Sequence, residues 1–242
     1  TIGSITIGIE EGLIFPKVPG EIRLETPAGM VEVTYHQTGK KVDWVKFHNG
    51  KSFLAASNLS VESTHLGTIV FDVSYGVNFY AIVDSQKNFS GLQDYTATEL
   101  IQFSREIRER INDKYPNLFV HPEDETIRDV SHILWTGKTL APNASARNAV
   151  FYGDKALDRS PCGTGTSARM AQWYAKGLLK PGEDFIHESF IGSQFTGRIE
   201  EVTTLDNQPA IIPSIQGWAR TYGYNKIIID DDDPFAEGFQ VI

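Results

Sequence analysis

Short apolar runs bounded by turn residues, some of them alternating with polar residues, dominate this chain and predict a protein made mostly of β-strands. Alternation on both sides of Thr26-Pro27-Ala28-Gly29 is typical of a β-hairpin that turns at those residues. Because side chains in a strand point alternately to opposite faces, each run predicts a strand with one buried face. The predicted strands cover residues 22–26, 30–34, 42–47, 68–73, 78–83, 211–212, 219–222 and 226–229.

Three segments carry a helical pattern instead. One follows Thr96, where Glu99 stands three residues later and predicts a capping box. A second covers residues 166–177 and is expected to bury Leu178 beyond its end, and residues 1–12 are a third candidate despite their β-branched residues and glycines. A few helices among many strands, without regular alternation of the two, predict an α+β fold rather than a doubly wound sheet.

Composition and charge narrow the classes of function. The net charge of −9 argues against a nucleic-acid surface, and no apolar run is long enough to cross a membrane. A single cysteine excludes an internal disulfide framework and fits a reducing cytoplasm. The histidines show no metal-ligand spacing with one another or with Cys162, and no nucleotide fingerprint follows a strand. We therefore expect neither a metal nor a cofactor.

The segment 158–171 contains the candidate chemistry. Cys162 lies in a loop punctuated by Pro161 and Gly163, directly before the helical pattern begins. A helix N-terminus favours thiolate, so the location predicts a lowered thiol pKa. The amides of Gly163, Thr164 and Gly165 lack helical acceptors and are suited to binding an anion. A buried structural cysteine is the alternative, but a packed core would not need these glycines and hydroxyls.

The same segment resembles the proline racemase family. Asp-Arg-Ser-Pro-Cys-Gly-Thr-Gly-Thr-Ser-Ala at 158–168 is similar to that family's second active-site motif. Further similar blocks bring the resemblance to essentially the whole chain; they lie at residues 1–12, 79–84, 192–198 and 233–239. The family includes proline racemases, 4-hydroxyproline epimerases and 3-hydroxyproline dehydratases.

The resemblance implies a fold of the diaminopimelate epimerase type, in which two lobes each wrap a curved sheet around a central helix and hold the active site between them. It implies that residues 1–50 are a remnant of the first lobe, that 51–216 form the second, and that 217–242 return to the first. In the family a Met-Cys-Gly-His block precedes the position of Thr1. We expect this chain to be the C-terminal portion of a longer enzyme and to be inactive alone.

The resemblance also implies an activity, which is cofactor-independent epimerisation of 4-hydroxyproline at the α carbon by two thiols. Cys162 would be one thiol and the upstream cysteine the other. The amides of Gly163 and Thr164 would hold the substrate carboxylate, and Asp158 the ammonium group. His132 and Tyr152 would face the substrate ring, with His132 pairing with its hydroxyl.

Several alternatives stay open at this point. A proline racemase differs only in its substrate, whereas a 3-hydroxyproline dehydratase usually has threonine in place of Cys162. An inactive binding module is the non-enzymatic alternative. We expect a small-molecule substrate, no nucleic-acid or membrane partner and a cytoplasmic protein, with a homodimer left open. One departure from the family is Val77, which stands where a second glycine is usual.

Overall fold

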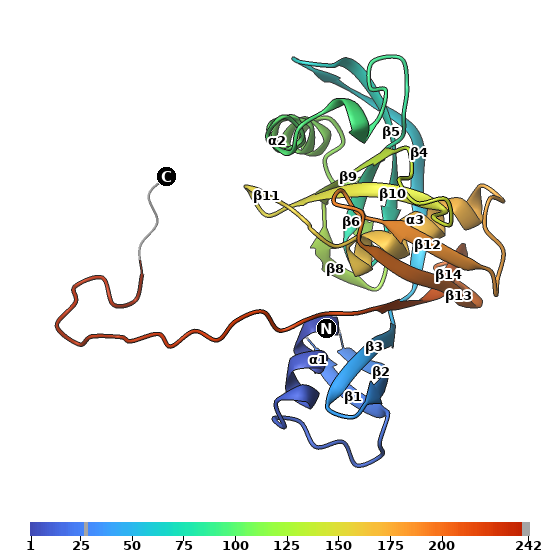
Figure 1. Ribbon diagram of the computed structural model, residues 1–242. Helices are drawn as coiled ribbons and strands as arrows, with labels where there is room; N and C mark the ends of the chain where they lie inside the picture. Colours follow the sequence, from blue (N-terminus) through green and yellow to red (C-terminus); the bar gives the residue numbers. More distant parts are fainter. Residues whose placement is uncertain (27–28, 239–242) are drawn as a thin grey trace.

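The computed structural model describes residues 1–26 and 29–238 (Figure 1). Its helices are α1 (Ile2–Glu10), α2 (Ala97–Lys114) and α3 (Gly163–Ala175), with a 3-10 turn at Leu92–Asp94. Its strands are β1 (Glu21–Thr26), β2 (Gly29–Thr38), β3 (Lys41–His48), β4 (Ser52–Ser63), β5 (Gly67–Tyr75), β6 (Phe79–Val83), β7 (Val120–His121), β8 (Asp124–Arg128), β9 (Val130–Gly137), β10 (Ala146–Tyr152), β11 (Ala156–Leu157), β12 (Asp184–Glu188), β13 (Gln194–Leu205) and β14 (Gln208–Gly217).

One large sheet closes around α3. Its strand order is β1-β2-β3-β14-β13-β12-β10-β9-β6-β5-β4. Strand β14 also pairs with β4 through Ala210 and Ile211, so the strands from β4 to β14 form a closed ring. Helix α3 lies inside this ring, against β4, β5, β6, β13 and β14 (Figure 1). The predicted α+β class and the sheet wrapped around a central helix are therefore confirmed.

A smaller part of the chain extends from this ring. Strands β1, β2 and β3 form an antiparallel meander, and β3 continues the sheet by pairing with the end of β14. Helix α1 packs on β3 and buries Ile2 and Ile5. These side chains share one hydrophobic cluster with Val33, Val45 and Phe47. This packing, rather than helix propensity, accounts for a helix in a segment rich in glycine and β-branched residues.

Helix α2 covers the outside of the ring as its pattern predicts. The Thr96 side chain accepts from the Glu99 amide, and the Glu99 carboxylate accepts from the Thr96 amide, so the predicted capping box is confirmed. Leu100, Ile107 and Ile111 are fully buried. None of the helices in the described part of the chain has the length and hydropathy needed to span a membrane.

Most of the strand predictions before residue 218 are confirmed. Strands β1, β2, β3, β5, β6 and β14 contain predicted segments, although residues 27 and 28 of the predicted turn lie outside the described residues. The strands expected over 219–222 and 226–229 are wrong, because the chain leaves the sheet after β14; Ala219 still packs against the body, whereas Tyr222 and Ile227 are exposed (Figure 1). Burial of Leu178 is also wrong, since it lies beyond the end of α3 and is 60% exposed.

Candidate active site

Cys162 is the N-cap residue of α3. Its sulfur accepts a hydrogen bond from the Gly165 amide at 3.3 Å, which is the place that a serine or aspartate oxygen usually takes at a helix start. Its backbone has φ +63° and ψ 119°, a conformation that residues other than glycine rarely adopt. Strained backbone of this kind persists only where the surroundings fix it.

The loop before Cys162 is fixed from several sides. The fully buried Asn148 amide donates to the Pro161 carbonyl at 2.9 Å. The Ser160 hydroxyl accepts from the Cys162 amide at 3.1 Å, and Asp158 accepts from the Ser160 amide at 2.8 Å. These bonds hold the strained cysteine in place.

Two hydroxyl groups contact the sulfur. The Tyr80 hydroxyl from β6 and the Thr164 hydroxyl from the first turn of α3 each lie 3.5 Å from the Cys162 sulfur. They are 2.6 Å from each other, so the three atoms form a closed triangle. Together with the Gly165 amide, three groups that can donate a hydrogen bond lie within reach of the sulfur.

The predicted lowering of the thiol pKa is wrong. Burial of the sulfur raises the pKa of Cys162 above its ordinary value, and the hydrogen bonds from Tyr80, Thr164 and Gly165 only partly oppose that effect. The negative charge of Asp158 adds to the rise. Burial of the sulfur thus has a larger effect on the thiol pKa than the hydrogen bonds that it accepts.

A cavity of about 740 Å³ opens beside this cysteine. The N-termini of two helices line it, namely Thr1–Gly3 of α1 and Gly163–Thr164 of α3. The remaining wall is mixed in character. It is formed by Thr26, Val31, Phe47, Asn49, Val77, Arg159, Ser160, Ile191, Ser193, Gln194, Phe195, Trp218 and Ala219.

The wall at α3 is suited to a carboxylate. The amides of Gly163 and Thr164, at the first two positions of α3, have no carbonyl one turn earlier to pair with. The helix dipole adds positive potential there. A side chain at residue 163 would place its Cβ 3.1 Å from the Phe47 ring, so the glycine keeps this edge of the cavity open.

His132 contacts Tyr80, and Tyr80 in turn contacts Cys162. His132 on β9 pairs with Tyr80 on the parallel strand β6, and the centroids of their rings are 4.7 Å apart. Burial, aided by the charge of Arg108, lowers the pKa of His132 to about 4, so its imidazole is neutral at pH 7. Its Nδ1 lies 2.7 Å from the Ser131 hydroxyl.

The other predicted residues differ in their positions. Asp158 is half-buried, and its charge acts on both Cys162 and Tyr80. Tyr152 ends β10 with 43% of its surface exposed, and it is absent from the described cavity wall. Gly163 and Thr164 line the cavity next to Cys162, whereas Asp158, His132 and Tyr152 are all absent from its described wall.

Sequence reasoning missed several residues of this site. Tyr80 was part of a similar block, but nothing in its strand pattern separated it from a core tyrosine. Asn49 lines the cavity and donates to the Ser167 hydroxyl at 2.9 Å. In the sequence it follows a predicted strand, where asparagine is common, so no motif marks it as a site residue. Phe47 and Trp218 come from segments far apart in the sequence, so only the closed sheet reveals their common place.

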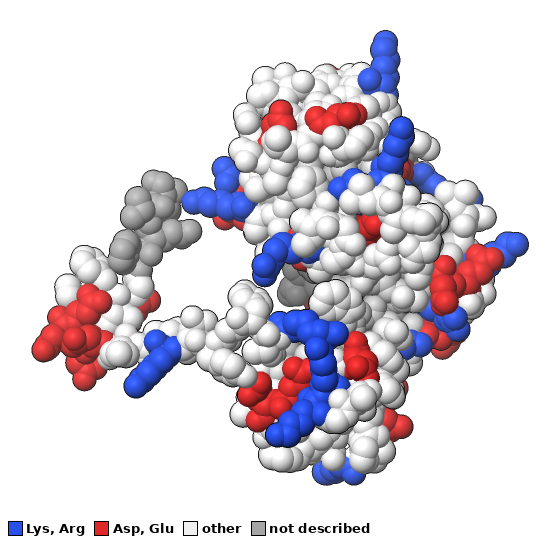
Figure 2. Space-filling model, viewed as in Figure 1, with Lys and Arg blue, Asp and Glu red and all other residues white. Residues whose placement is uncertain are grey.

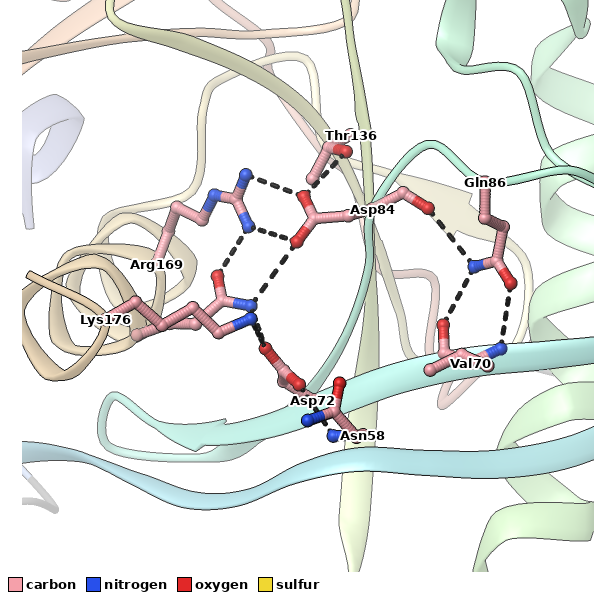
Figure 3. Close-up of polar contacts among 9 residues, drawn as sticks. Asn58, Val70, Asp72, Asp84, Gln86, Thr136, Arg169 and Lys176 are labelled. Atoms are coloured by element: carbon pink, nitrogen blue, oxygen red, sulfur yellow. Dashed lines mark hydrogen bonds and ion pairs between the residues drawn. The ribbon is translucent and has the colours of Figure 1, made fainter. Parts of the chain in front are cut away.

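A polar network anchors α3 to the surrounding strands (Figure 3). Arg169 binds Asp84 through both carboxylate oxygens, at 2.7 and 3.0 Å. Although burial alone would raise it, the pKa of Asp84 is lowered by this guanidinium. About two turns later Lys176 pairs with Asp72, which also accepts from Gln172 at 2.5 Å. The network fixes the helix that carries the cysteine.

Charge is distributed without a basic patch on the face shown in Figure 2, where blue and red side chains are interspersed. A concentrated acidic group lies at Asp230–Asp233 on the extended tail. Among the residues of known position, no three His, Cys, Asp or Glu side chains are grouped so that they could hold a metal ion.

Comparison with known proteins agrees with this geometry. The family model described as proline racemase matches residues 1–240. A 4-hydroxyproline 2-epimerase of Spirosoma linguale is 62% identical over 242 residues, which are the whole of this chain and 72% of that protein. A 4-hydroxyproline 2-epimerase of Brucella suis biovar 1 is 58% identical over 241 residues, again covering 72% of its length.

A solved structure is similar over nearly the whole chain. It is a hydroxyproline epimerase from Agrobacterium vitis with bound trans-4-hydroxy-L-proline, with a TM-score of 0.88 and 32% identity. The alignment covers 98% of this chain and 68% of that one. With its cysteine at the start of a helix enclosed by a sheet, this chain belongs to the proline racemase family.

Proposed function

We propose that this chain belongs to an enzyme that catalyses the epimerisation of 4-hydroxyproline at its α carbon, with Cys162 as one of two proton-transferring groups and without a cofactor. The observation that carries the proposal is the strained, hydrogen-bonded Cys162 beside the open amides of α3 at the wall of the cavity. The substrate assignment is supported by the 4-hydroxyproline 2-epimerases at 62% and 58% identity.

The carboxylate of the substrate binds at the start of α3. The amides of Gly163 and Thr164 hold it, and Asp158 attracts the ammonium group from the preceding loop. Binding there neutralises negative charge that grows when the α proton leaves, because the electrons of the broken C–H bond spread into the carboxylate. Fixed donors in a site shielded from water are effective at this task.

Cys162 acts on one face of the α carbon. As a thiolate it takes the α proton, forming an S–H bond, and as a thiol it returns a proton in the reverse direction. Inversion requires a second group on the other face, which delivers or removes a proton in the same cycle. The family resemblance assigns that group to a thiol, and the N-terminus of α1 on the same cavity supports its place there.

The test is direct. The full-length enzyme incubated with trans-4-hydroxy-L-proline in D₂O should produce the epimer inverted only at the α carbon, and product should carry deuterium there. NMR measures both properties in one sample. Product without α-deuterium, or no product from folded enzyme, would contradict the proposal.

A further inference from the structure

Tyr80 is the side chain whose position the family motif does not explain. It lies on β6, its surface is fully buried, and its ring packs between the strand layer and the start of α3. Its hydroxyl contacts two groups of the site, the Thr164 hydroxyl at 2.6 Å and the Cys162 sulfur at 3.5 Å. A buried phenol placed in this way has a partner for each of its hydrogen-bonding roles.

The triangle restricts how the hydrogens are arranged. Each hydroxyl has one proton to donate, so a thiolate at Cys162 leaves two ordered states. Either Tyr80 donates to Thr164 and Thr164 donates to the sulfur, or Thr164 donates to Tyr80 and Tyr80 donates to the sulfur. In both states one O–H group points at the sulfur and the other supports it.

We propose that Tyr80 is a catalytic residue of this site, whose hydroxyl, with that of Thr164, stabilises the Cys162 thiolate that removes the α proton. The inference rests on the proposed function and adds a residue to it. When the thiolate takes the proton, a sulfur electron pair forms the S–H bond and the C–H electrons stay with the substrate. The phenol keeps its own proton throughout.

Two observations support this role. Burial, together with the neighbouring thiol, raises the pKa of Tyr80 well above its ordinary value, which keeps the phenol protonated. Of the hydrogen bonds that lower the pKa of Cys162, the one from Tyr80 has the largest effect. Hydrogen bonds to charged groups are stronger than those between neutral groups.

Other ionisable groups face this cysteine from its surroundings. Asp158 in the preceding loop acts against the thiolate through its charge. His132 on β9 lies behind the Tyr80 ring, and His187 on β12 contacts Thr166 one turn into α3; both are neutral at pH 7. Arg159 is exposed at the cavity wall. The hydrogen bonds on the sulfur come from uncharged donors.

The test follows alkylation of Cys162 by iodoacetamide, measured by mass spectrometry on the peptide that carries this cysteine, so that a second thiol of the full-length enzyme does not contribute. The alkylation rate is measured against pH, and its midpoint gives the thiol pKa. Tyr80→Phe keeps the ring against His132 and removes only the hydroxyl. Its midpoint should rise by about one pH unit, so alkylation below the midpoint should slow about tenfold.

Matched variants complete the experiment. Thr164→Val should also raise the midpoint, Thr164→Ser should not, and the double variant with Tyr80→Phe should rise beyond either single one. Tyr115→Phe is the control, since that hydroxyl donates to the distant Ser60 carbonyl at 2.9 Å, and its midpoint should stay at the wild-type value.

An unchanged midpoint in folded Tyr80→Phe would overturn the inference. Should that variant fail to fold, the Thr164 pair decides, because equal midpoints in Thr164→Val and Thr164→Ser would overturn it as well. The outcome is separate from that of the proposed function, since alkylation needs no substrate. An epimerase with an unmoved midpoint would contradict only the role of Tyr80.

Discussion

The imidazole of His132 packs on the phenol ring of Tyr80, with centroids 4.7 Å apart and ring planes 30° apart. Because the Tyr80 hydroxyl contacts Cys162, this ring contact connects a candidate specificity residue to the reactive sulfur. Burial keeps His132 neutral, which suits hydrogen bonding to a substrate hydroxyl rather than attraction of a charge.

His132→Ala should therefore reduce activity on 4-hydroxyproline more than activity on proline. Loss of a partner for a buried polar group costs about 1–3 kcal/mol, or roughly five- to more than hundredfold in rate. The measurement is the ratio of kcat/KM for the two substrates in the full-length enzyme. An equal loss on both substrates would reduce His132 to a packing role and make proline racemase an equal candidate.

Val77, at the cavity wall, should lower the free energy of unfolding of the protein through backbone strain. Its φ of +77° is one that β-branched residues rarely adopt, and it stands in the turn between β5 and β6. Relief of strain of about 1–3 kcal/mol should exceed the entropy cost of a glycine, so Val77→Gly should raise the free energy of unfolding by about 1 kcal/mol.

Urea denaturation measures this effect. The matched control is Val70→Gly in β5, where a glycine should lower the free energy of unfolding by about 0.5–1 kcal/mol. A decrease of the same size in both variants would show that the turn is not strained. Gly76→Ala should be far worse than either, because its Cβ would lie 2.3 Å from the Thr164 carbonyl oxygen.

The buried His187 should make the free energy of unfolding depend on pH. Burial, aided by the charge of Arg169, lowers the pKa of His187 to about 3, whereas an unfolded histidine has a pKa of about 6.5. Between these values the unfolded chain binds a proton that the folded protein does not. The free energy of unfolding should therefore fall as the pH is lowered through that range, by up to about 1.4 kcal/mol per pH unit for this group.

Replacing His187 with Gln should make that slope shallower, even if the variant is less stable at every pH. Denaturation curves between pH 7 and the acid limit of folding give the slope. A slope in His187→Gln equal to that of wild type would contradict the assignment.

The sequence reveals the parts of this fold that have a local signature. The Thr96 capping box and the loop at Pro161 each depend on residues that are close together in the sequence, so the starts of helices α2 and α3 are predictable. Strand β4 is not, because its two irregularities between Leu54 and Leu59 break the alternation on which strand prediction depends. Segment 226–229 is rich in isoleucine, which favours strands, but it has no strand partner among the described residues.

The candidate site also contains residues that the sequence predicts and residues that it does not. Cys162, Gly163 and Thr164 are contiguous and were predictable, whereas Tyr80 reaches the sulfur only because β6 lies beside α3 in the closed ring. The thiol pKa was wrongly predicted since the position before a helix is visible in the sequence, while burial of the sulfur is a property of the whole fold.

Replacement of Cys162 by Ser in the full-length enzyme tests the central claim most directly, with α-deuterium exchange and epimerisation of trans-4-hydroxy-L-proline followed together by NMR. A serine hydroxyl is a far weaker acid than a thiol, so both rates should fall by about 10²–10⁴-fold while thermal unfolding shows an intact fold. Epimerisation at the wild-type rate by folded Cys162→Ser would contradict the claim that this thiol transfers the α proton.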